Sequence, residues 1–429
     1  MKKILLLLAL LGGLIGFAVY YQNQQNATLN TAASRGKKLR DKLLPELNIA
    51  ATRKFVIKDA KNSVTINIAD DLKTAVVDER AGYPASIEKL GNTMSELAEQ
   101  QISSKVQIGK TAWAKHNLKA PGDGAEGVGT QVEMKDGAGN NIATLVLGSN
   151  TEITGTQNQN PMMGGSSQRL VRIPEDEETI WQVSNTFFDL EAKPENWIDK
   201  AFIDVQKIKE ITVTAAKAED SWTINRAKDT DTDFNLVTTQ TAEKLDNTKI
   251  TASSLLSSPS FNDVNAKDKA AELLKDAVKA KITTFDGFTY DVQVAKQSKD
   301  GSDKYYMTVN VSADIPKART PGKDEKEEDK KKADEAFNAD KKAKEDKLAK
   351  EQKFAGWVYE VSEYTVNNLL KKRGEITKID PPKATAAPAP AAAPSTATTP
   401  PISVTTPPVA APAPAAPAPA KAEGDAAKK

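Results

Sequence analysis

The pattern of hydrophobic and polar residues changes along the chain, and it begins with a long apolar run. This uncharged run begins at Ile4 and ends at Tyr21, directly after Lys2 and Lys3. A helix of that length spans about 27 Å, enough to cross the hydrocarbon core of a bilayer. Because lysines before a membrane span favour a cytoplasmic N-terminus, residues 1–21 predict a single-pass anchor of a bacterial inner membrane. The bulk of the chain is then expected on the periplasmic side.

A cleaved signal peptide is the alternative interpretation of this run. Cleavage needs small residues just after the apolar stretch, but Phe17, Val19 and Tyr20 occupy that zone. The chain has no cysteine, so it cannot carry a lipid on an N-terminal cysteine. We therefore expect a retained anchor, followed by a polar stalk at residues 22–52.

From residue 53 the pattern changes to period two, which is typical of half-buried strands. It predicts strands around Phe55 and Ile57, at 64–68 and at 75–77, and then at 128–134, 142–147, 169–173 and 179–183. A glycine-rich hairpin turn at 136–140 joins the second group, and residues 155–167 form a polar loop. Between the two groups, Pro84 is expected at the first position of a helix. The buried face of that helix shows helical spacing and comprises Ile87, Leu90, Met94 and Leu97.

A similar cycle begins near residue 200. Strands are predicted around Ile211, Trp222 and Phe234, then a helix at 241–257, then strands at 261–264, 280–285, 289–295, 305–311 and 354–361, and a closing helix at 363–373. The order of strands, one helix and more strands thus occurs twice. We predict an α+β fold with two antiparallel-sheet subdomains, 53–199 and 200–374, each with a packed helix.

Two further segments have biased compositions. Residues 317–353 alternate acidic and basic side chains at helical spacing, which favours a solvated helix inserted into the second subdomain. Disorder is the alternative, above all near Pro321 and Gly322. Residues 375–429 hold more than half of the chain's 22 prolines, with much alanine and threonine, and predict a disordered, extended tail.

Composition excludes several classes of function. The formal net charge is +1, with 59 basic and 58 acidic residues, so no overall field favours nucleic acid. The absence of cysteine removes thiol catalysis, disulfides and cysteine-bound zinc. His116 is the only histidine, which makes a serine-histidine triad or a histidine-rich metal site improbable. We expect a structural or surface role for it.

Three short motifs imitate ligand sites. Gly122, Gly124 and Gly127 match GxGxxG, but a dinucleotide fingerprint follows a strand and opens a helix, whereas here a strand follows. Asp229, Asp231 and Asp233 resemble the start of a calcium loop. That loop requires glycine and glutamate at later positions, where this chain has Phe234 and Gln240. We therefore interpret both segments as turns.

The third motif is acidic. Residues 175–178 are four consecutive acids between two predicted strands, and we interpret them as a solvated hairpin tip rather than a cation site. No catalytic, cofactor-binding or metal-binding residue is predicted, and no cofactor is expected. Any two carboxylates could still converge as in a glycosidase.

Several short segments in order along the chain are similar to the DUF4340 family, a bacterial membrane-anchored family of undefined function. They are Gly82-Tyr83-Pro84 with the helix after it, Asp136-Gly137-Ala138-Gly139 leading to Leu145-Val146-Leu147-Gly148, Phe188-Asp189-Leu190, Trp197-Ile198-Asp199-Lys200 with Asp204, Phe261-Asn262-Asp263-Val264, Thr284-Phe285-Asp286-Gly287 and Trp357-Val358-Tyr359. The resemblance implies an association with ABC-2-type transport systems, including those of gliding motility. It supplies no catalytic residues.

Three hypotheses follow. The first is a non-catalytic, membrane-tethered envelope protein that binds or supports an ABC-type permease and ATPase. The second is an exported hydrolase that acts on cell-wall carbohydrate through carboxylates. The third is a structural spacer, in which the charged helix and the proline-rich tail provide reach.

Overall fold

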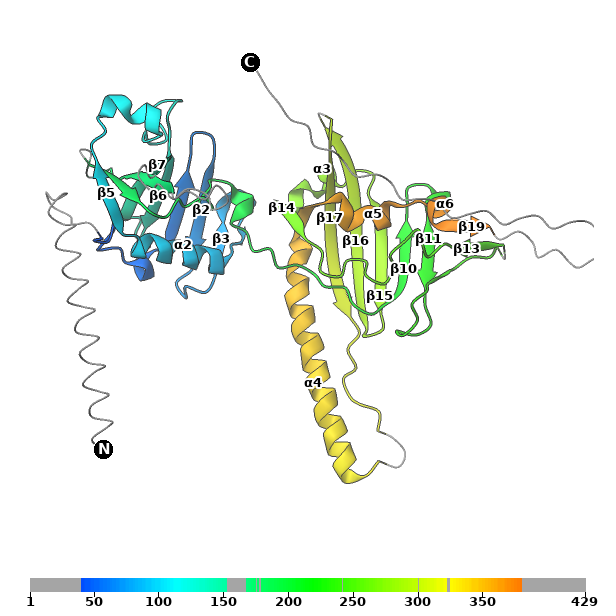
Figure 1. The fold of residues 1–429 in the computed structure, drawn as a ribbon. Coiled ribbons are helices and arrows are strands. Elements are labelled where there is room, and N and C mark those ends of the chain that lie inside the picture. Colours follow the sequence, from blue (N-terminus) through cyan, green and yellow to red (C-terminus); the bar gives the residue numbers. More distant parts are fainter. Residues whose placement is uncertain are drawn as a thin grey trace, which may run out of the picture. The chain divides into compact units, whose positions relative to one another are not determined.

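The computed structural model describes residues 40–379 apart from 153–166, 175, 177–178, 241, 300 and 322–324. These residues form an α+β fold with two large antiparallel sheets and one long helix, as predicted (Figure 1). No helix among them is long and apolar enough to cross a membrane. The run that begins at Ile4, most of the loop at 155–167, most of the acidic turn at 175–178 and the proline-rich tail after residue 379 lie outside the described residues.

The first sheet has nine strands in the order β4-β3-β2-β1-β6-β7-β8-β9-β5. Its strands are β1 (Lys54–Lys58), β2 (Ser63–Ile68), β3 (Ala75–Val77), β4 (Tyr83–Pro84), β5 (Ile102–Val106), β6 (Thr130–Lys135), β7 (Asn141–Glu152), β8 (Ser167–Arg172) and β9 (Ile180–Val183). The strands predicted from period-two patterning between residues 53 and 183 are confirmed. Short 3-10 turns lie between β3 and β4 at η2 (Asp78–Arg80) and between β5 and β6 at η3 (Lys110–His116), and η4 (Pro194–Asn196) follows β9 on the way to the second sheet.

Helix α2 (Ile87–Glu99) covers one face of this sheet and buries Leu90, Met94 and Leu97, as predicted. Its start was predicted wrongly. Pro84 belongs to β4, and the helix begins after Ser86, whose Oγ accepts a hydrogen bond from Lys89 N at 3.3 Å. The serine Oγ accepts a hydrogen bond from a free amide of the first helical turn, whereas a proline side chain has no acceptor. The helix therefore begins directly after the serine.

Helix α2 connects β4 and β5, which are the two edges of the first sheet. The chain therefore passes from one edge of the sheet to the other through this helix.

Residues before β1 also pack on the first sheet, so regular contacts begin earlier than residue 53. Leu43 is fully buried and its amide donates to Gln100 O at 2.7 Å. The 3-10 turn η1 (Ile49–Ala51) follows and is capped by Asn48. The end of the predicted polar stalk thus contains a few apolar side chains that pack against the core.

The second sheet has eight strands in the order β12-β11-β10-β15-β16-β17-β18-β14. Its strands are β10 (Ile208–Thr214), β11 (Trp222–Asn225), β12 (Asn235–Leu236), β14 (Phe261–Ala266), β15 (Val278–Thr284), β16 (Phe288–Lys299), β17 (Ser302–Ala313) and β18 (Trp357–Val361). Short helical turns are η5 (Ala218–Asp220), η6 (Lys267–Lys269), α3 (Ala270–Leu273) and η7 (Gln352–Gly356). Helix α5 (Glu363–Leu370) covers the sheet and buries Val366 and Leu369.

The helix predicted at 241–257 is wrong. Among the described residues of that range, β13 (Glu243–Leu245) pairs with β19 (Thr377–Ile379), which follows α6 (Arg373–Ile376). The rest is an irregular loop with left-handed backbone at Leu256 and, just beyond the predicted helix, at Ser258. Serine and threonine hydroxyls compete for backbone hydrogen bonds and disfavour a helix interior. Because β13 pairs with β19, regular structure continues to residue 379, which is beyond the predicted end of the second subdomain at residue 374.

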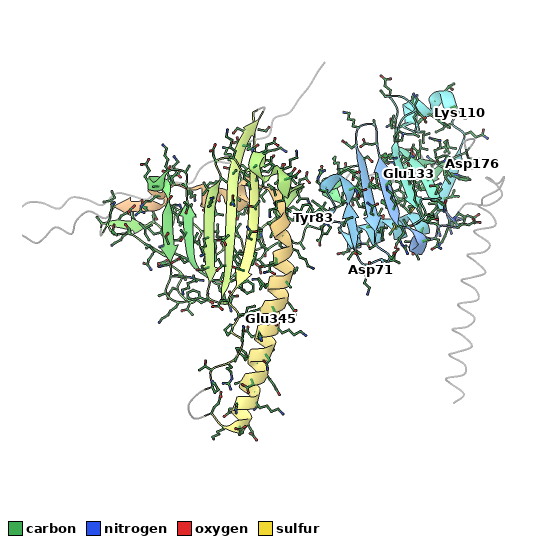
Figure 2. All side chains as sticks on the ribbon, turned by 180° about the vertical axis from the view of Figure 1, so that it is seen from behind. Asp71, Tyr83, Lys110, Glu133, Asp176 and Glu345 are labelled. Atoms are coloured by element: carbon green, nitrogen blue, oxygen red, sulfur yellow. The ribbon has the colours of Figure 1, made fainter. Side chains whose placement is uncertain are left out.

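Helix α4 (Glu327–Glu351) is the predicted charged helix, and it lies between β17 and β18. Figure 2 shows its side chains, including Glu345, projecting around it. Ion pairs one turn apart support it, such as Asp340 with Lys344 at 2.9 Å. Its last residue, Glu351, is buried, where it accepts hydrogen bonds from Tyr290 Oη at 2.9 Å and Asp204 N at 3.0 Å. The helix is therefore fixed at its base.

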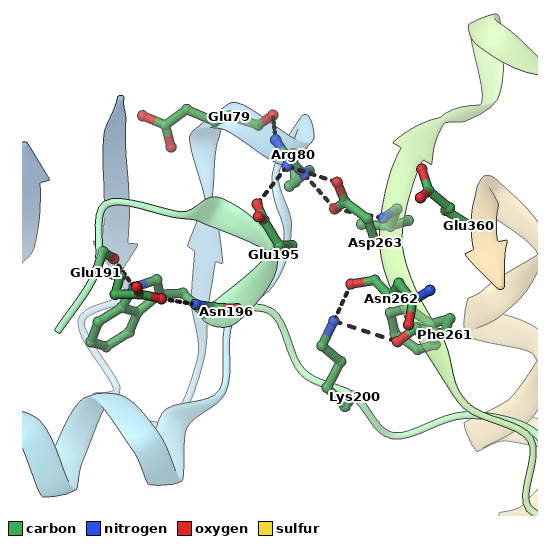
Figure 3. A network of polar contacts seen from close by, with 12 residues as sticks. Glu79, Arg80, Glu191, Glu195, Asn196, Lys200, Phe261, Asn262, Asp263 and Glu360 are labelled. Atoms are coloured by element: carbon green, nitrogen blue, oxygen red, sulfur yellow. Dashed lines mark hydrogen bonds and ion pairs between the residues drawn. The ribbon is translucent and has the colours of Figure 1, made fainter. Parts of the chain in front are cut away.

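Side chains from both sheets meet at one junction, drawn in Figure 3. Arg80 donates to both carboxylate oxygens of Asp263, at 2.6 and 2.8 Å, and to Glu195 at 3.1 Å. The Tyr83 ring packs edge-on against Trp357 at 5.0 Å. Burial raises the pKa of the Tyr83 phenol to about 12. This junction joins apolar residues of the two sheets into one buried cluster.

Candidate functional site

An apolar pocket of about 340 Å³ lies beside α2 on the first sheet. It is lined by Ile49, Ala50, Thr52, Ile68, Leu72, Ile87, Leu90, Gly91 and Met94. One wall is the turn η1, another is the loop after β2, and the third is the first half of α2. A pocket of this size with a mainly apolar lining is the usual form of a site for an apolar group.

The helical wall presents a gap at Gly91. Residues 87, 90, 91 and 94 share one side of α2 because they follow the helical period. A side-chain carbon added at Gly91 would meet no atom within 4 Å. Glycine in a helix interior costs about 1 kcal/mol relative to alanine, and no close packing compensates for that cost here. Gly91 therefore leaves space open that a side chain could have filled.

The opposite rim is Leu72, a large apolar side chain that is 43% exposed. Its backbone is left-handed, with φ of 57°, a conformation that is unfavourable for leucine. The turn is held by the preceding residue, Asp71, whose Oδ1 accepts hydrogen bonds from the amides of Lys73 and Thr74. The first of these is the main reason that the pKa of Asp71 lies below its usual range. The turn thus keeps an apolar side chain exposed at the edge of an apolar pocket.

Thr52 lies under the pocket. Its side chain is fully buried, and its Oγ1 has no hydrogen-bond partner in the part of the chain that the structure describes. A buried hydroxyl without a partner costs about 1–3 kcal/mol. The Thr52 hydroxyl thus lowers the stability of the fold at this side of the pocket.

The glycine motif is confirmed as a turn. Strand β6, not a helix, follows Gly127, so there are no helix amides to hold a phosphate. Gly122, Gly124 and Gly127 all have positive φ. At Gly127 an added side-chain carbon would lie 2.2 Å from the Ala114 backbone. Gly127 thus allows a close approach of two chain segments, and all three glycines permit the left-handed backbone of the turn.

The calcium-like aspartates also form a turn, as predicted, and an arginine occupies its centre. Arg226 donates to the backbone oxygens of Asp229 and Asp231, at 2.8 and 2.7 Å, and to the Asp229 carboxylate at 3.0 Å. Its guanidinium supplies the positive charge around which these oxygens gather. Among the described residues no group of three or more His, Asp or Glu side chains could hold a metal ion.

His116 and the acidic turn complete the set of sequence candidates. His116 is half-buried at the end of η3, whose buried residue is Trp113. Of the four acids, only Asp176 is described, between β8 and β9. The structure thus places the sequence motifs in separate turns of the two sheets.

The pocket itself was not predicted. Gly91 inside an amphipathic pattern was the one local signal, because a glycine inside a helix costs about 1 kcal/mol relative to alanine. The other two walls come from η1 and from the loop at Leu72, and nothing in the sequence showed that they meet α2.

A family model described as "Domain of unknown function (DUF4340)" matches residues 76–304, more than half of the chain. The match begins inside β3 and ends inside β17, so each sheet extends beyond it. Helix α2 lies within the match, whereas Ile49 and Leu72 precede it. No curated protein and no solved structure matches the chain.

Proposed function

The chain belongs to the DUF4340 family, and from that premise we propose that it is a membrane-tethered accessory protein that acts by binding a partner. In this proposal residues 1–21 anchor the chain in the inner membrane, and the two sheets lie on the periplasmic side. The partner is the permease and ATPase of an ABC-type transport system or a related envelope complex, which is the association that the family resemblance implies.

The observation that carries the proposal is the apolar pocket with its exposed rim. Single exposed apolar side chains are common, but here Leu72 borders an apolar opening and is kept exposed by an unfavourable backbone. Gly91 keeps the same opening unfilled at a cost to helix stability. Both features are better explained by a binding surface than by stability of the fold.

The chemistry of the pocket favours an apolar protein segment as its occupant. Eight of the nine lining residues have no polar side-chain atom, and the remaining one, Thr52, is buried beneath the surface. Such a lining gives affinity through burial of apolar surface. Ile49 lies 28 residues after the proposed anchor, so the tether would keep this pocket within about 92 Å of the membrane.

The proposal is tested by affinity purification of the full chain from its own membranes in mild detergent. We expect an ABC permease and its ATPase to be recovered with the unchanged chain. Gly91→Leu, which fills the pocket, and Leu72→Asn, which removes the apolar rim, should each reduce that recovery at least tenfold. Asparagine tolerates left-handed backbone, so Leu72→Asn should fold normally.

Gly374→Leu is the matched control, because Gly374 is also a helical glycine with no atom within 4 Å of an added side-chain carbon. It should leave recovery unchanged. If neither transporter subunit is recovered, or if Gly374→Leu lowers recovery as much as Gly91→Leu, the proposal is wrong.

A further inference from the structure

A second opening, of about 380 Å³, lies on the second sheet between the loop at 248–260 and helix α5. We call it the polar cleft. It is lined by Thr248, Lys249, Thr251, Ser254, Leu255, Leu256, Ser257, Ser258, Pro259, Ser260, Ser362, Tyr364, Thr365, Asn367, Asn368 and Lys371. The loop wall is the segment that was wrongly predicted as a helix.

Hydrogen bonds tie the two walls of the polar cleft together. Lys371 Nζ donates to Lys249 O and, at 3.0 Å, to Asn368 Oδ1. Thr365 Oγ1 donates to Ser260 O at 3.5 Å. Leu255 and Leu256 are buried and anchor the loop in the core. The cleft is therefore a formed feature of the fold, with both walls fixed before any ligand binds.

Hydroxyl groups dominate the lining. Eight of the sixteen lining residues are serine or threonine, and two more are asparagine. A hydroxyl both donates and accepts hydrogen bonds, and an amide offers one group of each kind. This mixture suits a ligand that is itself a polyol, since each ligand hydroxyl also needs a donor and an acceptor.

The charge of the lining is positive. Lys249 and Lys371 are its only charged residues, and none of the sixteen is acidic, although the chain has 58 acids among 429 residues. Without a carboxylate the polar cleft also lacks the acid pair that glycoside hydrolysis normally uses. It can attract an anionic ligand but has no equipment to cleave a glycosidic bond.

Tyr364 adds an aromatic surface at the polar cleft. It is 89% exposed and belongs to the first turn of α5. An aromatic ring with a polar end can cover the apolar face of a sugar ring while its hydroxyl remains in water. Hydroxyl groups, two lysines and an exposed tyrosine are thus brought together from two segments separated by more than a hundred residues.

We propose that the polar cleft binds an acidic oligosaccharide, that is, a sugar chain bearing carboxylates. Its hydroxyl and amide groups bind the sugar hydroxyls, Lys249 and Lys371 bind the carboxylates, and Tyr364 stacks on a ring. The observations that support it are independent of the apolar pocket, so the two proposals can fail separately.

The test uses the full chain in a detergent without a sugar head group, because alkyl glycosides would compete for the polar cleft. Isothermal titration calorimetry measures the affinity of the chain for oligogalacturonate and, for comparison, for a neutral oligosaccharide of equal length. We expect saturable binding of the acidic chain at least tenfold tighter than that of the neutral one. Tyr364→Ala should weaken the binding at least tenfold and Lys249→Gln about fivefold.

Two matched controls test the location. Phe188→Ala removes another aromatic side chain that is 76% exposed, and Lys209→Gln removes an exposed lysine of β10. Both should leave the affinity unchanged. The proposal is overturned if oligogalacturonate does not bind saturably, or if Phe188→Ala weakens it as much as Tyr364→Ala. It is also overturned if inorganic phosphate at the same charge concentration displaces the oligosaccharide completely, because that result indicates a simple anion site.

Discussion

Helices α2 and α5 cover their sheets in the same way, but the openings beside them have opposite chemistry. Each helix begins after a serine whose Oγ accepts a hydrogen bond from the third helical amide, at 3.3 Å in both cases. Each also places a fully or nearly fully buried leucine, Leu90 or Leu369, on its sheet. Beside α2 the lining is apolar, whereas beside α5 it consists mainly of hydroxyls and lysines.

The difference shows which positions of a covering helix are constrained. The face on the sheet must be apolar because it forms the core. The flank beside an opening carries no such requirement, and here it carries Gly91 in one helix and Tyr364 in the other. The neighbouring loop then determines the chemistry of the second wall. We therefore expect substitutions under the helices to act on stability and substitutions on the flanks to act on binding.

The largest expected effects come from the leucines under the two helices. Leu90→Ala and Leu369→Ala should each destabilise the protein by about 2–5 kcal/mol, because a buried leucine loses its transfer energy and leaves a cavity. Leu90 borders the apolar pocket, so water can enter the space that it leaves, whereas the space left by Leu369 is closed. Leu90→Ala should therefore lie near the lower end of this range and Leu369→Ala near the upper end. Urea unfolding of the two variants measures the difference, and equal losses would show that the pocket does not reach Leu90.

Two buried threonines, Thr52 before β1 and Thr284 at the end of β15, allow a hydroxyl without a described partner to be compared with a hydrogen-bonded one. Thr284 of β15 accepts a hydrogen bond from Phe288 N at 2.9 Å and donates to the Asp286 carboxylate. Thr284→Val should cost about 1–3 kcal/mol, because it leaves buried polar groups without a partner. Thr52→Val removes a hydroxyl that has no partner among the described residues, so it should be neutral or stabilise by about 1 kcal/mol. A large loss for Thr52→Val in thermal unfolding would contradict the structure of the pocket floor.

Much of the fold followed from local pattern. The strands of the first sheet are half-buried, so residues such as Val64, Ile66 and Ile68 alternate with polar neighbours and show the strand period directly. The error at 241–257 has the opposite cause. That segment buries Ala252, Leu255 and Leu256 at nearly helical spacing, but its serines and threonines compete for backbone hydrogen bonds and disfavour a helix. Apolar spacing alone could not distinguish a helix from a loop with buried anchors.

Neither opening could be predicted, because each is built from segments far apart in the chain. The apolar pocket needs Ile49, Leu72 and Gly91 to meet, and the polar cleft needs the loop at 248–260 to meet α5. Periodicity shows which side of a helix is buried, but it does not show which loop lies beside that side. In contrast, the local sequence alone was enough to exclude the glycine motif as a dinucleotide site and the aspartate motif as a calcium site.

Two buried glutamates, Glu133 of β6 and Glu351 at the end of α4, should give opposite pH dependence. Burial disfavours the charged form of Glu133, but hydrogen bonds from Lys135 and Lys58 outweigh it and hold the pKa of Glu133 below its usual range. For Glu351 burial dominates and raises the pKa, although Asp204 N and Tyr290 donate to it. A lowered pKa contributes stability above the unfolded value, near 4.5, and that stability is lost as pH falls. A raised pKa acts in the opposite direction, and its contribution is lost as pH rises.

Glu133→Gln should therefore lose stability relative to the unchanged protein as pH rises from below 4 to 7. Glu351→Gln should gain stability relative to the unchanged protein as pH rises from about 4.5 toward neutrality. A tenfold difference in proton affinity between folded and unfolded states corresponds to about 1.4 kcal/mol. Unfolding midpoints in urea at several pH values measure both slopes. Slopes of the same sign would show that one of the two carboxylates is not in the environment described.

The smallest expected effect is at Gly91, and it decides whether the apolar pocket is kept for binding. Gly91→Ala adds a side-chain carbon that meets nothing within 4 Å, so it should stabilise α2 by about 0.5–1 kcal/mol through helix propensity alone. Thermal unfolding should show a small rise in Tm, and transporter recovery should stay close to normal because most of the pocket remains open. Gly91→Leu should retain that gain in stability while it abolishes recovery. A loss of stability in Gly91→Ala would mean that α2 packs against this position, and the glycine would then need no functional explanation.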